Sequence, residues 1–396
     1  MTRISYAASL ALSAAILASL TLPAAAATEK VLWNFQGAKL GSPVGRLLLR
    51  KSTGALFGTG SSADNGYGQV FRLTPSGGIW KIKTLVKFTG SNGANPEAGL
   101  ISDSTGALYG TTHDGGAYGY GTVFKLSVSG GIWTETVLYN FTGSSDGANP
   151  YCDLVMDSSG ALYGTTENGG SNGWGTVFEL ARSGGTWTET VLHSFNSFYG
   201  DGATPVAGLH RDAASGILYG TTSSSDQGGT VFALSQSGGV WLYEVIYDFT
   251  GGADGAGPNA GVIEGPKHNL YGTTYAGGAY GYGTVFELVS GFDWTEKVLY
   301  SFTGGSDGSN PLAALHLDTS GALYGTTYVG GTNGAGVVFK LTQSGGVWTE
   351  SVLHDFDDPI SDGDLPEAGV IADSAGNLYG TTYDGVDFGT VYEITP

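Results

Sequence analysis

Aspartate or asparagine recurs at one position of the glycine-rich segments of this chain, and a proline follows it closely each time. The acidic or amide residues are Asn92, Asp146, Asp201, Asp254, Asp307 and Asp362, and the prolines are Pro96, Pro150, Pro205, Pro258, Pro311 and Pro366. Such carboxylates could bind cations or sugar hydroxyls. Asp-Gly and Asn-Gly also form tight turns, and proline stiffens the chain after them. A property shared by every repeat is usually architectural, so turn formation is the favoured interpretation.

The last of these segments is the most acidic, with Asp355, Asp357, Asp358, Asp362, Asp364 and Glu367. Calcium takes roughly six to eight oxygen ligands, which one aspartate per segment cannot supply without backbone carbonyls. No segment has the alternating aspartates of a calcium-binding loop. We expect no organic cofactor. A calcium site is predicted only in the last segment, with a solvated acidic loop as the alternative. Its ligands would be Asp357, Asp358, Asp362 and Asp364.

Aromatic residues lie between glycines in a second set of segments. Tyr67 is one of them, and Tyr275, Tyr328 and Tyr383 directly follow a Thr-Thr pair. Aromatic rings beside aspartates suit a carbohydrate, whose apolar faces stack on rings while its hydroxyls bind polar groups. The alternative is that the rings pack on neighbouring loops and cover glycine-rich backbone. The predicted ligand-binding residues are Tyr118, Tyr120, Trp174, Tyr280 and Tyr282, together with Asp146, Asp201, Asp254 and Asp307.

A catalytic group in a repeat protein should depart from the repeat. The departures are His113, Cys152, Asp153, Glu167, Phe198, Tyr199, Asp226 and Gln227. They match no nucleophile elbow, zinc-binding His-Glu-x-x-His motif or phosphate-binding loop. Other histidines share positions of the repeat, which indicates packing: His193 and His354 stand in the position of Tyr139, and His210 and His316 in that of Ile101. An enzyme is therefore the less favoured hypothesis.

One repeat positions all these residues. Tyr-Gly-Thr-Thr, or a close variant, occurs seven times at spacings of 52–56 residues, with its glycine at Gly58, Gly110, Gly164, Gly220, Gly272, Gly325 and Gly380. The second copy contains four β-type runs, at 99–103, 107–112, 121–126 and 133–141. Four strands in a repeat of this size are typical of a propeller blade. The sequence therefore predicts an all-β, seven-bladed β-propeller with four antiparallel strands per blade.

The ends of the chain predict how the ring closes. Residues 31–35 match a fourth strand, whereas residues 389–394 match a third strand, after which the chain stops. Pairing the two would complete the last blade and leave only short edges exposed, which favours a monomer. Near the axis, the position before the first strand is small, with Asp153 as the exception. Its residues are Gly45, Gly99, Gly208, Gly261, Ala314 and Gly369.

The recurring pattern Ala-Leu-Tyr-Gly-Thr-Thr, Gly-Gly, Gly-Thr-Val-Phe-x-Leu and Ser-Gly-Gly-x-Trp resembles the GloVer tandem repeat. That repeat occurs in exported bacterial proteins described as having a choice of anchor. The resemblance covers nearly the whole chain after residue 27, and it implies a propeller-like protein outside the cytoplasm. It assigns no catalytic residue. Because the chain stops at Pro396, we expect no C-terminal sorting segment.

Composition sets the remaining limits. Residues 1–27 have the features of a secretion signal: Arg3, an apolar run over 6–22 and the small residues of 24–27. Residues 28–396 would then form a single propeller domain of seven repeats, with no other segment able to span a membrane. Cys152 is the only cysteine, so no intramolecular disulfide can form. A net charge of −19 with only 16 lysines and arginines argues against nucleic-acid binding.

The longer loops of the repeat, between the second and third strands and between blades, should share one face of the ring. We expect a ligand site on that face, around the mouth of the central channel. The leading hypothesis is a secreted or periplasmic binding module whose partner is a carbohydrate or an extracytoplasmic protein. A polysaccharide-active enzyme and a structural protein of the envelope or matrix are the alternatives.

Overall fold

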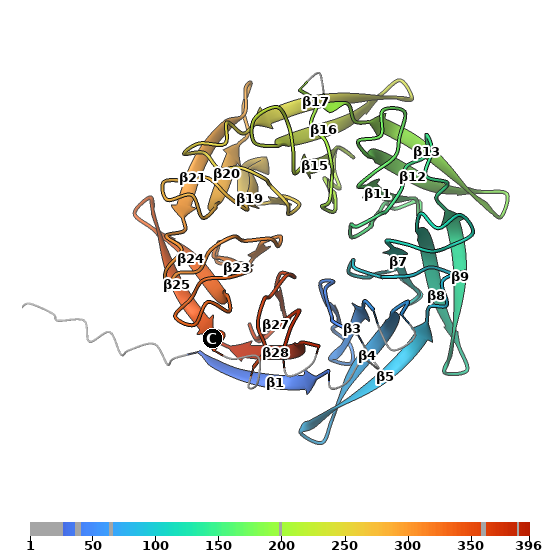
Figure 1. Cartoon of the computed structure of the whole chain (residues 1–396), viewed down its shortest axis with the longest axis horizontal. Helices are drawn as coiled ribbons and strands as arrows, with labels where there is room; N and C mark the ends of the chain where they lie inside the picture. The colour runs from blue at the N-terminus through green and yellow to red at the C-terminus, as the bar shows by residue number, and fades with distance from the viewer. Residues whose placement is uncertain (1–26, 36–40, 63–65, 198–199, 358–361, 386–387) are drawn as a thin grey trace, which may run out of the picture.

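The computed structural model describes residues 27–35, 41–62, 66–197, 200–357, 362–385 and 388–396. Within these ranges the strands form seven four-stranded antiparallel sheets around a central axis (Figure 1), which confirms the predicted seven-bladed propeller. The predicted signal segment lies outside the described residues except for Ala27. No helix in the described part of the chain has the length and hydrophobicity needed to cross a bilayer.

The first four blades follow one another along the chain, each running from the axis outward. Blade 1 contains β2 (Leu48–Arg50), β3 (Ala55–Gly60), β4 (Gln69–Ser76) and β5 (Ile79–Lys87), and blade 2 contains β6 (Ile101–Ser102), β7 (Leu108–Thr112), β8 (Thr122–Ser129) and β9 (Ile132–Asn140). Blade 3 contains β10 (Val155–Met156), β11 (Leu162–Thr166), β12 (Thr176–Ser183) and β13 (Thr186–Ser194), and blade 4 contains β14 (His210–Arg211), β15 (Leu218–Thr222), β16 (Thr230–Ser237) and β17 (Val240–Asp248).

The last three blades include the one helical turn of the described residues, η2 (Pro266–His268), and the ring closure. Blade 5 contains β18 (Ile263–Glu264), β19 (Leu270–Thr274), β20 (Thr284–Val289) and β21 (Thr295–Ser301), and blade 6 contains β22 (His316–Leu317), β23 (Leu323–Thr327), β24 (Val337–Ser344) and β25 (Val347–Asp355). Blade 7 contains β26 (Ile371–Ala372), β27 (Leu378–Thr381) and β28 (Thr390–Thr395), and its outer strand is β1 (Thr28–Asn34), antiparallel to β28.

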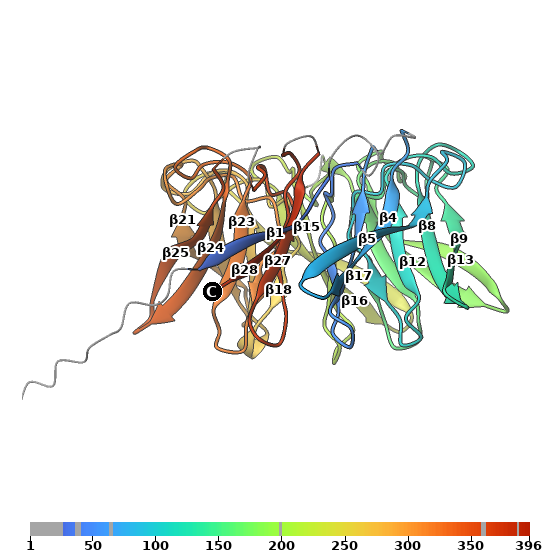
Figure 2. The same cartoon turned by 90° about the horizontal axis from the view of Figure 1, so that it is seen from below.

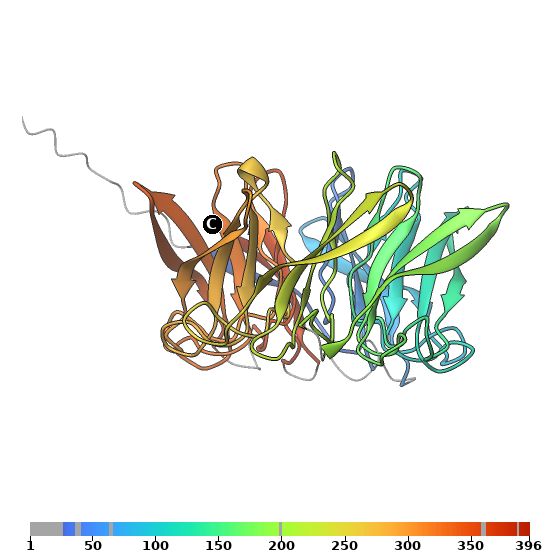
Figure 3. The ribbon, with the colours of Figure 1, turned by 90° about the horizontal axis from the view of Figure 1, so that it is seen from above.

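Seen edge-on, the molecule has two different faces (Figures 2 and 3). Because the strands of a blade are antiparallel, the loops between second and third strands emerge on the same face as the crossing loops, which link one blade to the next. We call this the loop face. The opposite face carries the short turns between first and second strands and between third and fourth strands. We call it the turn face.

The blades are held together by a buried aromatic pair at every interface. A phenylalanine at the end of one outer strand meets the ring of the next blade's third strand edge-on, as Phe141 meets Phe178 at 5.2 Å between centroids. The glycine of Tyr-Gly-Thr-Thr makes room for that ring, since a Cβ on Gly164 would lie 2.8 Å from Phe178 Cζ. The other pairs are Phe35–Phe71, Phe88–Phe124, Phe195–Phe232, Phe249–Phe286, Phe302–Phe339 and Phe356–Tyr392.

The first threonine of Tyr-Gly-Thr-Thr adds a hydrogen bond across six of the interfaces. Its hydroxyl donates to a backbone carbonyl of the next blade, as Thr165 Oγ1 does to Ala207 O at 2.9 Å. Thr59, Thr111, Thr221, Thr273 and Thr326 make the same bond. In blade 7, Thr381 Oγ1 is buried and has no partner among the described residues.

The structure corrects one assignment in the channel wall. Leu48 pairs with Phe57 as Ile101 pairs with Tyr109, so Arg46 stands where the other blades have a small residue, and Gly45 corresponds to Ala98. The prediction that Gly45 fills the small position was therefore wrong. Arg46 and Asp153, the two exceptions, meet inside the channel with 3.5 Å between Nε and Oδ2.

Blade interfaces also contain carboxyl groups. A glutamate of the outer strand faces the crossing loop that arrives from the preceding blade. Burial raises the pKa of Glu350 to about 7, and the charge of Asp307 adds to the rise. Glu189 and Glu296 show the same effect opposite their own aspartates. At the first interface the loop carries Asn92, which donates to Glu135 Oε2 at 2.6 Å.

We predict that the threonine bonds contribute unequally to stability. Thr165→Val removes the donor to the Ala207 carbonyl at constant shape and should lower the free energy of unfolding by about 1 kcal/mol. Thr381→Val removes a buried hydroxyl without a partner and should cause no loss. Denaturant unfolding of both variants would measure this, and equal losses would show that the bond across the interface contributes nothing.

We also predict that stability falls as the pH rises from about 5 to about 8. Glu189, Glu296 and Glu350 have an ordinary pKa of 4.5 and a folded-state pKa of about 7. Their stabilisation is therefore complete below the unfolded value and is lost as the pH rises through the folded value. Asp307→Asn gives Glu350 the donor that Asn92 gives Glu135, so this variant should lose less stability over the same range. Thermal unfolding at several pH values checks this, and curves parallel to wild type would contradict it.

Candidate functional site

The mouth of the channel on the loop face is lined by one residue from each blade. These residues surround a cavity of about 290 Å³. Each directly follows the proline of a crossing loop, where the repeat otherwise varies little. We call them the axial ring: Val44, Glu97, Tyr151, Val206, Asn259, Leu312 and Glu367.

One backbone conformation of the crossing loop sets the direction of the axial-ring residues. In six of the seven crossing loops the residue before the proline is left-handed, with φ of 57° at Asn149 and 55° at Leu365, and this turn directs the following residues into the channel wall. Asparagine tolerates that conformation better than most residues. The Asn149 side chain also donates to the carbonyl of His113 at 3.1 Å, so the crossing loop is tied to the neighbouring loop.

A second circle surrounds the axial ring and is fastened to it. Its residues follow the second threonine of Tyr-Gly-Thr-Thr or its counterpart. Each backbone N–H of the circle from blade 2 to blade 7 donates to the residue before a crossing-loop proline, as Glu167 N does to Asn149 O at 3.1 Å. We call this circle the rim: Ser61, His113, Glu167, Ser223, Tyr275, Tyr328 and Tyr383.

The residue types in the two circles differ from one side of the channel to the other. Blades 2 and 3 contribute the ionisable rim residues His113 and Glu167, whereas blades 5, 6 and 7 contribute three tyrosines. Tyr151 of the axial ring is 36% exposed and meets the His113 ring edge-on at 5.9 Å between centroids. The rim thus has imidazole and carboxyl groups on one side of the channel and tyrosines on the other.

His113 is the centre of a charged cluster at the mouth. Its Nδ1 lies 3.1 Å from Asp114 Oδ1, and its Nε2 lies 3.4 Å from Glu167 Oε2. Burial acts to lower the pKa of His113, but Glu167, Asp114 and Glu97 together raise it to about 9. The imidazole is therefore a cation at neutral pH that donates from both nitrogens.

The two carboxyl groups of the axial ring hold their protons more tightly than usual. Burial raises the pKa of Glu367 to about 7, and the negative charge of Glu97 adds to the rise. Burial also raises the pKa of Glu97, against the opposing effect of His113. Near neutral pH the mouth can thus offer both a protonated and an ionised carboxyl to a ligand.

The predicted aromatic residues lie on the loop face, but none of them lines the axial cavity. The rings of Tyr120 and Tyr282 cover glycines of the next crossing loop, because a Cβ on Gly143 or Gly304 would lie 2.6 Å from them. Tyr118 and Tyr280 are 61% exposed, and Trp174 is 40% exposed. Their role in ligand binding stays a prediction.

The predicted aspartates are engaged in the crossing loops themselves. Asp307 accepts from Tyr300 Oη at 2.9 Å, from Thr303 N at 2.8 Å and from Thr303 Oγ1 at 2.5 Å. Asp146 and Asp254 make the same three contacts in their own loops. Asp201 lies 3.0 Å from His193 Nε2 and accepts from Asn196 N at 2.8 Å. These bonds support the architectural interpretation and explain why a tyrosine or a histidine occupies this position of the outer strand, while a role of these aspartates in ligand binding stays a prediction.

The predicted metal ligands occupy the crossing loop between blades 6 and 7. Asp362 lies 2.8 Å from His354 Nε2, Asp357 is exposed, and the backbone of Asp364 pairs with that of Asp384. Asp358 lies outside the described residues, so this metal site stays a prediction. Where the structure is described, the group of three donors within 4.8 Å of one another lies elsewhere.

The departures from the repeat are partly brought together. His113 and Glu167 stand at the same position of neighbouring repeats and meet at the rim. Cys152 is buried, and burial raises the pKa of its thiol to about 11, so it is a packing residue beside Thr165. Phe198 and Tyr199 lie outside the described residues. The sequence signal for the axial ring is that the residue after the proline is of five different types in the seven repeats.

Comparisons with known proteins place these observations in a family. The model of the Gloeobacter/Verrucomicrobia repeat matches residues 18–228 and 213–396. A search of curated proteins gives no match. An ancestral GH74 enzyme superposes with a TM-score of 0.60 at 12% identity, covering 90% of this chain and 48% of that one, so the chain spans about half the enzyme's length.

Two further solved structures cover nearly the whole chain. One is a proposed gluconolactonase, with a TM-score of 0.47, 13% identity, and coverage of 93% of this chain and 92% of its own. The other is a protein of unknown function from Dyadobacter fermentans, with a TM-score of 0.45, 12% identity, and coverage of 93% and 98%. At such identities the similarity to solved structures is one of fold.

We predict that the crossing-loop aspartates support the fold. Asp307→Ala removes an acceptor that is only 9% exposed and leaves the Tyr300 and Thr303 donors unpaired, so it should lower the free energy of unfolding by about 2 kcal/mol. Tyr280→Ala, a change at an exposed ring, should alter it by less than about 0.5 kcal/mol. Denaturant unfolding measures both. A stable Asp307→Ala protein would contradict the structural role of this aspartate.

Proposed function

The chain belongs to the Gloeobacter/Verrucomicrobia repeat family, and we propose that it is a binding module that takes a small carbohydrate in its axial mouth. The observation that carries this proposal is the axial ring. A scaffold of seven similar repeats places residues of five different types around one cavity. Variation at such a position is expected of a surface that recognises a ligand.

The chemistry of the mouth suits a polyhydroxylated ring. Tyr151 offers an aromatic face for stacking, and Asn259, Glu97 and Glu367 offer donors and acceptors for hydroxyl groups. Val44, Val206 and Leu312 supply the apolar part of the wall, as small-molecule sites usually require. The cavity is at the small end of the range for such sites, so we expect one or two sugar units or the end of a longer chain.

The proposal places the protein outside the cytoplasm, as the family resemblance and the features of residues 1–27 suggest. Cell fractionation with N-terminal sequencing of the mature protein tests that placement. A protein retained in the cytoplasm with residues 1–27 intact would leave the binding site in place and would contradict export.

A second candidate function, hydrolysis of a polysaccharide, is favoured by one observation. The raised pKa of Glu367, about 7, is what a general acid needs near neutral pH, and a second carboxyl, Glu97, lies close enough to influence it. Incubation with oligosaccharides would show shortened products if the mouth is catalytic. Glu367→Gln would then abolish product formation while the ligand still binds.

We predict that carbohydrate binding depends on the mouth and not on the outer loops. The mature protein should bind a member of a glycan array, and Tyr151→Ala should weaken that binding about tenfold or more in calorimetry through the loss of stacking. Tyr118→Ala, which removes an equally large ring outside the cavity, is the matched control and should bind like wild type. Loss of binding in Tyr118→Ala with retention in Tyr151→Ala would move the site to the outer loops. The absence of any glycan ligand would overturn the proposal.

A further inference from the structure

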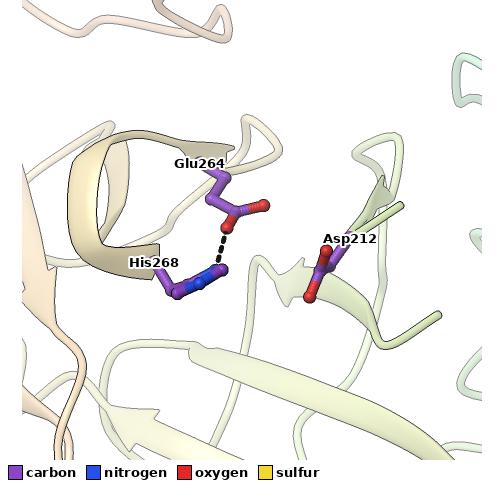
Figure 4. Close-up of side chains that lie close together, drawn as sticks. All are labelled: Asp212, Glu264 and His268. Atoms are coloured by element: carbon purple, nitrogen blue, oxygen red, sulfur yellow. Dashed lines mark hydrogen bonds and ion pairs between the residues drawn. The ribbon is translucent and has the colours of Figure 1, made fainter. Parts of the chain in front are cut away.

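A group of potential metal ligands lies on the turn face, at the interface of blades 4 and 5. Figure 4 shows the carboxyl groups of Asp212 and Glu264 and the imidazole of His268 directed toward a common space. Asp212 follows β14, Glu264 ends β18, and His268 ends η2. Their donor atoms all lie within 4.8 Å of one another.

A second histidine, His210 of β14, lies beside this group. His268 Nδ1 lies 2.5 Å from Glu264 Oε1, and His210 Nε2 lies 2.9 Å from Glu264 Oε2. His210 and Asp212 are two residues apart on one strand and its extension, which puts them on the same side. Two imidazoles and two carboxylates therefore converge, two donors from each blade.

The group departs from the repeat in blade 5. In blades 2, 3, 6 and 7 the aspartate after the first strand closes the turn and accepts from a tyrosine hydroxyl, as Asp318 does from Tyr324 at 3.0 Å. Asp212 is the corresponding residue of blade 4 and closes its own turn, accepting from Ala214 N at 2.8 Å and from Ser215 Oγ at 2.5 Å. Blade 5 has Gly265 at that position and places η2 after it. Glu264 also differs from its counterparts, which are Leu49, Ser102, Met156, Arg211, Leu317 and Ala372. The turn chemistry shared by the blades thus does not account for Glu264 or His268.

The donor set selects the kind of metal. Imidazole nitrogens with carboxylate oxygens suit zinc and its first-row neighbours, whereas calcium and magnesium prefer oxygen alone. Ligand atoms of a tetrahedral zinc site lie roughly 3.3 Å apart, given metal–ligand distances of about 2.0–2.1 Å. The separations of 2.5 Å and 2.9 Å from the two imidazoles to Glu264, and the limit of 4.8 Å among Asp212, Glu264 and His268, are close to that spacing. Small side-chain movements of these three residues would reach it, and His210 would join as fourth ligand from its contact with Glu264.

We propose that Asp212, Glu264 and His268, with His210 as fourth donor, form a site for a first-row divalent metal such as Zn²⁺ that joins blades 4 and 5. The metal replaces the protons that now lie between the imidazoles and Glu264. The His268 side chain is 67% exposed, so the site opens to solvent and takes up metal without unfolding. This site is independent of the carbohydrate site on the opposite face.

The test uses untagged protein freed of metal by a chelator and titrated with Zn²⁺ in a calorimeter. We expect one equivalent to bind with a dissociation constant on the order of micromolar or below, a rise in melting temperature, and no comparable effect of Ca²⁺. His268→Asn should weaken Zn²⁺ binding at least tenfold. Asparagine tolerates the left-handed backbone at this position, where φ is 60°, so the variant should fold normally and melt like wild type in chelator.

His316→Ala is the matched control, because His316 occupies the position of His210 in blade 6. It should bind Zn²⁺ like wild type, whereas His210→Ala should bind more weakly. Substitution with Co²⁺ adds a second readout, since visible absorption bands of a nitrogen- and oxygen-ligated ion should appear in wild type and vanish in His268→Asn. Failure to saturate at one equivalent, or unchanged affinity in His268→Asn, would overturn the proposal and leave Glu264 as the acceptor between two histidines.

Discussion

The packing of a phenylalanine against a glycine is the constraint on which the rest of the propeller depends. The ring of Phe178 fits over Gly164 on the adjacent strand and meets Phe141 of the preceding blade, and any side chain at Gly164 would collide with it. Every blade repeats this contact, and Tyr392 takes the part of the phenylalanine in blade 7. Because the same contact recurs around the ring, the angle between blades is nearly constant, and seven such angles close a circle. Hydrogen bonding is least complete in blade 7, since Thr381 Oγ1 and Tyr392 Oη are buried without hydrogen-bond partners among the described residues.

Because the repeated packing contact fixes the blades, side chains on the loop face can serve in recognition. The left-handed residue before six of the seven crossing-loop prolines, such as Asn149, fixes the backbone that positions the axial ring and the rim. Side chains there can then change without altering the frame, which explains how valine, glutamate, tyrosine, asparagine and leucine occupy equivalent positions around one cavity. The crossing-loop aspartates are the opposite case. They recur because the loop needs an acceptor for its own backbone and for the tyrosine or histidine of the outer strand.

The sequence was sufficient to predict the blade count, the strand number and the sharing of one face by the longer loops, because these follow from a periodic pattern and from antiparallel topology. It was less informative about individual site residues. Tyr118 and Tyr280 are conspicuous in the sequence, but they do not line the cavity. Glu97 and Glu367 look like single charges among turn residues, and only the closure of the ring brings Glu97 close enough for its charge to raise the pKa of Glu367. The error at Gly45 had a simple cause, since the first repeat differs most from the others and allows a shift of one residue.

Contacts between neighbouring blades follow from the period of the repeat and can be predicted from the sequence. Residues at the same or an adjacent position of neighbouring repeats lie close together, as His113 does to Glu167 and His210 to Glu264, each pair 54 residues apart. Blades that are not neighbours meet only near the axis, as Arg46 and Asp153 do. Two departures in neighbouring repeats are thus more informative than two departures in distant ones, unless both lie at the axis. By that rule, candidate functional residues of such a protein are sought as pairs of exceptions on adjacent blades or around the channel, and the two proposed sites were found in that way.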